Sequence, residues 1–224
     1  MLMSSTAVLA QVSALPEDLK KKGYNMNSQI IASLKNRRSQ YQLSSFLPSS
    51  PKETTDLIQE AIRLSPSSFN SQSSRAVILY GQQHHKLWTI TADSLRRVVP
   101  ADSFAATRDK IATFAQGAGT VLFYEDVDVV KGLQEQFTLY SENFPIWSEQ
   151  SNGMAQLAVW AALADAGIGA SLQHYNPLID DDVADEWDVP APWKLRAQMP
   201  FGTATGKALD KSFMDDAARF KVFG

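Results

Sequence analysis

The segment from Ser151 to Ala166 most strongly limits the folds open to this chain, because it is apolar around most of a helical circumference. Its bulky apolar members, with alanines between them, are Met154, Leu157, Val159, Trp160 and Leu163. A surface helix keeps one polar face, whereas this pattern predicts a helix covered by protein on most sides. Gly167 follows directly and predicts its end. The fold must therefore hold this helix in its interior.

Another helix has recognisable signals at both ends. Ser50 can cap it, Pro51 suits its first position and Glu53 completes a capping box. Apolar residues then recur at helical spacing as far as Leu64, and the residue before Pro66 is disfavoured in a helix. We expect a helix over residues 51–64 and a loop over 67–74.

Short apolar runs predict the strands of a central sheet. They occupy residues 75–81, 120–124, 168–172 and 194–201. Periodic patterns predict further helices over residues 84–99, 104–114 and 129–139. Long helices and scattered strands without regular alternation of strand and helix indicate an α+β fold.

Three other segments carry local expectations. The aromatic cluster Phe144–Trp147 interrupts the helical pattern. It is interpreted as a surface flap or a pocket wall, and a plain packing role is the alternative. A polar loop is expected after Pro177, and its consecutive residues Asp180–Asp182 are interpreted as a solvated face rather than a metal site. The final residues 219–223 alternate charged and apolar side chains, as a half-exposed strand does.

Composition favours one globular domain that acts on small molecules. The 224 residues are 44% hydrophobic, enough for a sizeable core, and 21 basic against 24 acidic side chains give no general attraction to nucleic acid or an anionic membrane. The chain has no cysteine, which excludes disulfides and thiolate ligands and favours the cytoplasm. Met1–Ala14 lacks a charged start and a continuous apolar core, so we expect no signal peptide. No stretch reaches the roughly 20 apolar residues that span a bilayer, so we expect no membrane span.

Common catalytic motifs fail in their details. Gly202–Lys207 is one residue too short for a phosphate loop and continues with alanine. Gly117–Gly119 and Gly167–Gly169 lack the third glycine of a dinucleotide fingerprint. The histidines, which fit no zinc or triad signature, are His84, His85 and His174. The chemistry is therefore left to a bound cofactor.

Three polar segments stand out from this background. Asn36–Ser39 follows a short apolar helix over residues 30–34, and its two guanidinium groups and hydroxyl suit a phosphate. The alternative is that these residues are an ordinary basic helix end, stabilised by the helix dipole. Ser65–Gln72 is a loop rich in hydroxyls and amides, which turn chemistry alone could explain. Gly169–Pro177 puts polar residues just beyond a strand, where loops commonly hold ligands.

In order and spacing these segments resemble the nitroreductase superfamily, in which an Arg-Arg-Ser, a Pro-Ser-Ser-x-Asn-x-Gln loop and a late Gly-x-Gly-Ala strand surround FMN. Asn70–Gln72 followed by Arg75–Val77, together with Leu172–Asn176, is similar to the branch containing the yeast nitroreductase-like proteins and small bacterial nitroreductases. The resemblance begins near Ile30. Residues 1–27 are therefore expected to be an extension of unknown role, and residues 28–224 a single FMN-binding domain.

The resemblance implies a nitroreductase-like α+β fold, with a central, mostly antiparallel sheet flanked by helices, in an intertwined homodimer with FMN at the interface. The residues implied to hold the phosphate and ribityl chain are Arg37, Arg38, Ser39, Lys207, Arg219 and Lys221. Those implied to line the flavin from the second subunit are Pro66, Ser67, Ser68 and Asn70, with Gln72 nearby. The backbone implied to face the isoalloxazine ring, with an N–H near N5, is that of Leu172, Gln173 and His174.

The resemblance also implies ping-pong reduction of nitroaromatic, quinone or related acceptors by NADH or NADPH. Solvent can supply the protons, and His174 and Tyr175 are candidate donors. Two departures affect the pocket: Tyr41 replaces a common basic residue, and Ser73–Arg75 replaces a common Pro-Trp. Two alternatives stay open, a flavin-binding stress or regulatory protein with incidental reductase activity, and the same fold without flavin.

Overall fold

The computed structural model describes residues 28–224. Residues 36–224 form one compact unit, which contains the sheet and every site described below. The expected N-terminal extension and Met1–Ala14 lie outside the described residues, and the domain boundary at residue 27 stays a prediction. The helix expected at residues 30–34 is confirmed as α3 (Gln29–Asn36), which buries none of its side chains.

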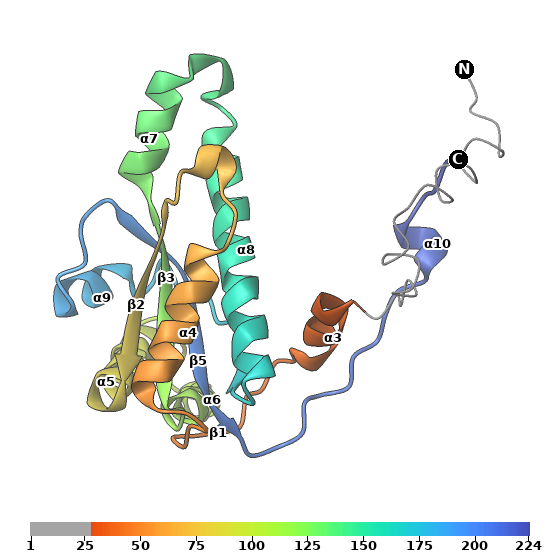
Figure 1. The fold of residues 1–224 in the computed structure, drawn as a ribbon. Helices are drawn as coiled ribbons and strands as arrows, with labels where there is room; N and C mark the ends of the chain where they lie inside the picture. The colour runs from red at the N-terminus through yellow and green to blue at the C-terminus, as the bar shows by residue number, and fades with distance from the viewer. Residues whose placement is uncertain (1–27) are drawn as a thin grey trace. The chain divides into compact units, whose positions relative to one another are not determined.

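A mostly antiparallel sheet forms the centre of the unit of residues 36–224 (Figure 1). Its strands, in spatial order, are β1 (Leu43–Ser44), β5 (Trp193–Ala204), β3 (Gly119–Asp126) and β2 (Ser74–Tyr80), and β4 (Gly169–Ala170) pairs with β5 outside this path. Each of these strand pairs is antiparallel. The four predicted strands are confirmed, although the run at 168–172 contributes only two residues.

Helices cover both faces of this sheet. On one face lie α4 (Pro51–Arg63) and α8 (Phe144–Asp165), and on the other lie α5 (Gly81–Arg96), α6 (Phe104–Ala115) and α9 (Asp180–Glu186). The remaining helical segments are η1 (Ser68–Asn70), α7 (Val127–Gln136), η2 (Thr138–Tyr140) and α10 (Asp216–Arg219). This arrangement confirms the α+β fold.

The sequence of the central strand β3 is continuously apolar because both of its faces are buried. Val121 and Phe123 point to the face covered by α4 and α8, whereas Leu122 and Tyr124 point to the face covered by α5, α6 and α9. Side chains alternate between the two faces of a strand, so a strand covered on both faces needs apolar residues at every position.

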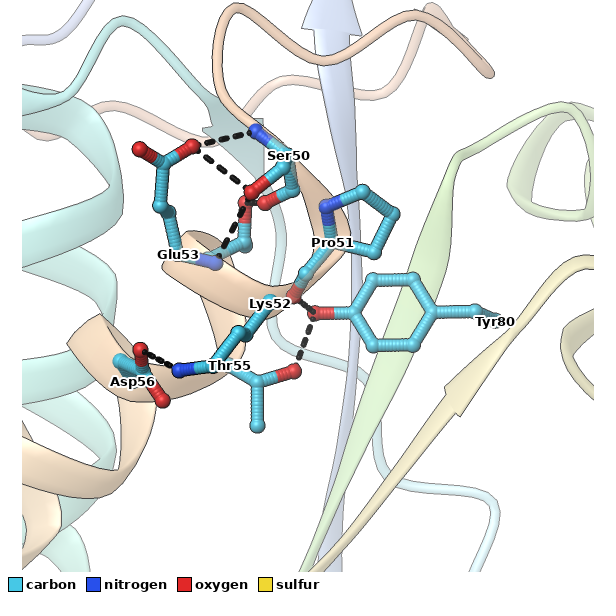
Figure 2. A network of polar contacts seen from close by, with 8 residues as sticks. Ser50, Pro51, Lys52, Glu53, Thr55, Asp56 and Tyr80 are labelled. Atoms are coloured by element: carbon cyan, nitrogen blue, oxygen red, sulfur yellow. Dashed lines mark hydrogen bonds and ion pairs between the residues drawn. The ribbon is translucent and has the colours of Figure 1, made fainter.

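The capping box at the start of α4 is confirmed, and Figure 2 shows its bonds. The Ser50 hydroxyl accepts from the Glu53 N–H at 3.2 Å, and the Glu53 carboxylate accepts from the Ser50 N–H at 2.9 Å. The Tyr80 hydroxyl, at the end of β2, donates to the Pro51 carbonyl at 3.1 Å and lies 3.0 Å from the Thr55 hydroxyl. The helix start is thereby joined to the sheet.

The expected buried helix is confirmed as α8, but it begins earlier than the sequence predicts. Phe144–Trp147 forms its first turn instead of interrupting the helical pattern, because Pro145 is well tolerated at this position. Ala155, Val159 and Leu163 are buried, whereas Met154 and Leu157 are 42% and 43% exposed. One chain therefore covers only part of the apolar circumference.

Two further predictions are wrong. Asp180–Asp182 begins helix α9 instead of forming a loop, and acidic side chains in a first helical turn are favoured by the helix dipole. Residues 219–223 form no strand, because α10 occupies Asp216–Arg219 and no strand of the described chain pairs with residues 220–224. Val222 and Phe223 are consequently among the most exposed apolar side chains of the described residues.

Candidate functional site

The segment Arg37–Ser39 is fixed against β4. Ser39 forms a parallel bridge with Ala170, and the Gln40 N–H donates to the Ala170 carbonyl at 2.9 Å. The Arg37 guanidinium lies 4.3 Å from the centre of the Trp160 ring, and Arg38 donates to the Leu209 carbonyl. The first and third polar segments of the sequence therefore adjoin within one chain.

A hollow of about 240 Å³ opens beside this segment. The residues lining it are Arg37, Arg38, Ser39, Tyr41, Leu209, Asp210 and Lys211. Two guanidinium groups, one ammonium group and two hydroxyls suit a phosphate, and Asp210 is the single carboxylate among them. Lys211 was not predicted from the sequence, because the tail has no periodic pattern that distinguishes one lysine from another. Lys207, Arg219 and Lys221 are exposed and do not line this hollow.

The loop after α4 is held in an unusual backbone conformation. Phe69, Asn70 and Gln72 have φ angles of 56°, 51° and 50°, which residues other than glycine seldom adopt. The Ser67 hydroxyl accepts from the Gln72 N–H at 2.9 Å, and the Ser67 carbonyl accepts from the Asn70 N–H at 3.0 Å. Pro66, Ser67 and Gln72 line a hollow of about 130 Å³ against α8. The loop therefore presents a fixed polar surface.

Phe69 belongs to an aromatic cluster that the sequence reveals only in part. Its ring centre lies 4.8 Å from that of Phe137, 5.2 Å from Phe144, 6.1 Å from Tyr140 and 6.3 Å from Trp147. These contacts join the polar loop to the hairpin of α7 and α8. The predicted cluster Phe144–Trp147 thus forms a wall beside the loop, and the positive φ of Phe69 directs its ring toward it.

The backbone beyond β4 is only partly occupied by hydrogen bonds. Gln173 exchanges two backbone hydrogen bonds with Gln198, at 2.8 and 2.9 Å. N–H groups alternate in direction along an extended chain, so those of Leu172 and His174 face away from Gln198. Neither donates a hydrogen bond within residues 28–224. Of the three expected backbone positions, Leu172 and His174 can donate to a ligand, whereas Gln173 serves the sheet.

The polar loop and the basic segment do not meet within one chain. The loop hollow contacts α8 at Ser151 and Ala155. The basic segment instead meets α8 at Trp160, under the Arg37 guanidinium, and at Ala164, which lines a small second hollow together with Arg38. At a rise of about 1.5 Å per residue, Ser151 lies roughly 14 Å from Trp160 and roughly 20 Å from Ala164 along the helix axis. The polar loop and the basic segment therefore lie at separate ends of α8.

Glu125 is a buried acid that the sequence suggested only as the polar end of a strand. It is 1% exposed, and its carboxyl group accepts from Asn152 Nδ2 at 3.0 Å. Burial raises the pKa of Glu125, against the opposing effect of hydrogen bonds from Ser73 and Asn152. Because Ser73 directly follows the polar loop, Glu125 braces the end of that loop from inside the protein.

The histidines offer no catalytic arrangement. His84 is buried, its Nδ1 lies 2.8 Å from the Thr120 hydroxyl, and burial followed by the charge of His85 lowers the pKa of His84 to about 4. Neutral His84 is thus a core residue at physiological pH. Residues 28–224 contain neither a His, Asp and Glu cluster suited to a metal ion nor a helix long and apolar enough to cross a membrane.

The fold and the comparisons with known proteins define an oxidoreductase. The sequence model of the nitroreductase family matches residues 34–203. The chain belongs to the nitroreductase family, in the branch that contains yeast and small bacterial members.

Its relatives cover most of the chain. Nitroreductase CinD from Lactococcus lactis, solved in complexes with nicotinic acid, chloramphenicol and 4-nitrophenol, is 49% identical in the first of these structures, with a TM-score of 0.81 over 87% of this chain and 100% of that chain. HBN1 and nitroreductase FRM2 of Saccharomyces cerevisiae are 32% and 31% identical, over 80% and 81% of this chain and 89% and 91% of their own lengths. The fold also recurs in a nitroreductase with bound FMN from Desulfitobacterium hafniense, which is 15% identical with a TM-score of 0.63 over 86% of this chain and 98% of that chain.

Proposed function

We propose that this oxidoreductase binds FMN at the interface of a homodimer and uses NADH or NADPH to reduce nitroaromatic, quinone or related aromatic acceptors in a ping-pong cycle. The observation that carries the proposal is the basic hollow formed by Arg37, Arg38, Ser39 and Lys211 beside β4. Its donors fit a phosphate group, and the backbone N–H groups of Leu172 and His174 lie further along the same chain segment that fixes it. Lys207, Arg219 and Lys221 stay predicted contributors.

The chemistry that FMN would supply is acceptance of a hydride from NAD(P)H and its delivery to an acceptor. The chain's own part is to bind and orient. The Leu172 and His174 N–H groups would donate toward the ring near N5, and Pro66, Ser67, Ser68, Asn70 and Gln72 would line it. The aromatic cluster around Phe69 would exclude water. Burial raises the pKa of Tyr175 to about 12, so its phenol keeps its proton and is a candidate donor beside His174.

A dimer is supported by the apolar surface that one chain leaves exposed. Met154 and Leu157 lie on α8, and Phe213 and Val222 in the tail are also exposed. A two-fold axis through the midpoint between Met154 and Leu157 pairs α8 with its copy in antiparallel orientation. The partner's Ser151 then lies level with Trp160. Such a pairing would bring the polar loop of one subunit to the basic segment of the other, which the separation along α8 prevents within one chain.

The nature of the acceptor is supported by a relative. CinD was solved with chloramphenicol and 4-nitrophenol, both of them nitroaromatic compounds, and with nicotinic acid. At 49% identity these ligands make planar aromatic acceptors the first class to test here. The cytoplasmic location stays a prediction from composition.

The deciding experiment is the visible absorption spectrum of purified protein, followed by anaerobic addition of NADPH or NADH. We expect a flavin spectrum that bleaches and then recovers over many cycles when 4-nitrophenol or a quinone is added. Bound flavin that bleaches slowly and never cycles would favour the stress or regulatory role. Absence of flavin after FMN is added would refute cofactor binding.

The dimer is tested separately with the double variant Met154→Asp/Leu157→Asp. We expect a monomer by light scattering that no longer retains FMN, because the two halves of the site are then apart. Val98→Asp, at an exposed apolar position just beyond α5, is the control and should remain dimeric with FMN. A monomeric double variant with a full FMN complement would contradict the shared site.

A further inference from the structure

A separate hollow of about 910 Å³ is lined by residues of α9 and of the turn after it, together with the end of β3 and the start of β5. It shares no lining residue with the hollows at Arg37–Ser39 and at the polar loop. Its lining is strongly acidic, with Asp180, Asp181, Asp185 and Asp188 against the single base Lys194. The proposed oxidoreductase function makes no use of it.

Helix stability explains only part of this acidity. Acidic side chains in the first turn of α9 are favoured by the helix dipole, which accounts for Asp180–Asp182. Asp185 lies in the last turn and Asp188 beyond it, where the same dipole disfavours negative charge. Asp181 and Asp185 are also four residues apart on one helix face, where like charges repel. We call Asp181, Asp185 and Asp188 the acid stripe.

Neighbouring acids have basic partners, but the acid stripe has none. Asp182 pairs with Arg97 at 2.7 Å, and Glu186 pairs with Lys86 at 2.5 Å. None of the three stripe carboxylates makes a hydrogen bond or an ion pair with any residue between 28 and 224. The uncompensated charge therefore faces the hollow.

Two buried polar atoms at the hollow also lack partners. Tyr124 is 2% exposed and lines the hollow, yet its hydroxyl makes no hydrogen bond within the described residues. Oδ1 of Asp180 is likewise buried without a partner. Burial and then the charge of Asp180 raise the pKa of Tyr124, so the two groups are near each other and the phenol keeps its proton. A buried polar group without a partner costs free energy, which points to a ligand that forms hydrogen bonds with both the Tyr124 hydroxyl and the Asp180 carboxylate.

The remaining walls suit the methylene groups of an organic cation. Val127, Val189, Pro190 and Pro192 line the hollow together with Trp193. The Trp193 ring already lies 5.8 Å from the guanidinium carbon of Arg75, which indicates that its electron-rich faces accept positive charge. The lining thus contains both carboxylates and apolar surface.

A metal ion does not fit, because no group of three His, Asp or Glu side chains in residues 28–224 converges on a common point. The stripe carboxylates Asp181 and Asp185 instead follow one another at roughly 6 Å along α9. We propose that this hollow binds an aliphatic polyamine, with its ammonium groups on Asp180, Tyr124 and the acid stripe and its methylene groups against Trp193 and the prolines. This site is independent of the flavin site and of the proposed reductase activity.

Equilibrium dialysis with radiolabelled spermidine, using the full-length protein at low ionic strength, tests the proposal. We expect saturable binding of one spermidine per chain that weakens at high salt, because exposed ion pairs are screened. The variant Asp181→Asn/Asp185→Asn should bind roughly threefold to tenfold more weakly, since each exposed ion pair contributes modestly. Glu135→Gln/Glu142→Gln, which removes the same charge from α7 and the following turn, should bind as the wild type does.

Tyr124→Phe separates a site from a diffuse negative surface. Its hydroxyl has no partner in the described chain, so its removal should weaken spermidine binding without lowering the melting temperature. Non-saturable binding, equal losses in the stripe and control variants, or equal displacement by magnesium chloride at matched charge would each show a counterion effect only and overturn the proposal. If circular dichroism shows that Asp181→Asn/Asp185→Asn does not fold, spermidine binding by Tyr124→Phe alone tests the proposal.

Discussion

Replacing Arg37 and Arg38 together by alanine is expected to abolish FMN retention while the fold survives. Hydrogen bonds from a charged donor contribute about 1.5–3 kcal/mol each, so losing both donors should cost roughly 3–6 kcal/mol of binding free energy. That loss corresponds to a dissociation constant about a hundredfold to ten-thousandfold higher. The folding cost should be small, because Arg37 contributes one contact with the Trp160 ring and Arg38 one bond to the Leu209 carbonyl.

Titration of FMN fluorescence with the protein measures the affinity. The control is Arg96→Ala/Arg108→Ala, which removes the same charge from exposed positions on α5 and α6. Arg38→Lys should give an intermediate loss, because lysine keeps the charge and loses the planar donor fork. An affinity within about threefold of the wild type would refute the phosphate site and leave these arginines as an ordinary basic helix end.

Three further predictions concern the scaffold. Because the pKa of Glu125 is raised in the folded state, the unfolded chain releases this proton first, and stability should fall as pH rises from about 4.5 toward the raised value. Glu125→Gln should flatten that dependence in urea unfolding between about pH 4 and pH 8, and an unchanged slope would contradict it. Ser50→Ala should lower the free energy of unfolding by about 1 kcal/mol, whereas Ser45→Ala, at an exposed hydroxyl, should not. Gly202→Ala would put a Cβ 2.2 Å from a backbone oxygen of β1 and should cost about 1–3 kcal/mol or more, whereas Gly132→Ala meets open space and should be tolerated in thermal melts.

Elements that depend on short-range signals were predictable from sequence. The capping box of α4 lies within four residues, and the apolar runs of β2 and β3 are long enough for both faces to be buried. The start of α8 was missed because Phe144–Trp147 looks like a break until its packing around Phe69 is known. The tail was misread because alternation alone does not supply a neighbouring strand.

The candidate site also contains residues that were predictable from the sequence and residues that were not. Arg37, Ser39 and the polar loop are recognisable because their residue types and order resemble a family pattern. Lys211 is not, since only the path of the chain brings it beside Arg38. Likewise, nothing in the local sequence distinguishes buried Glu125 from an ordinary polar strand end.

Residue type and local spacing were enough to predict the family, the types of most helices and strands, and the polar segments from which a flavin site can be assembled. Which of these segments are neighbours became known from the three-dimensional fold alone. The fold joined Ser39 to Ala170, separated the polar loop from the basic segment along α8, and turned the acid stripe toward a hollow. The physical reason is that capping and periodicity act over a few residues, whereas proximity between distant segments depends on how the entire core packs.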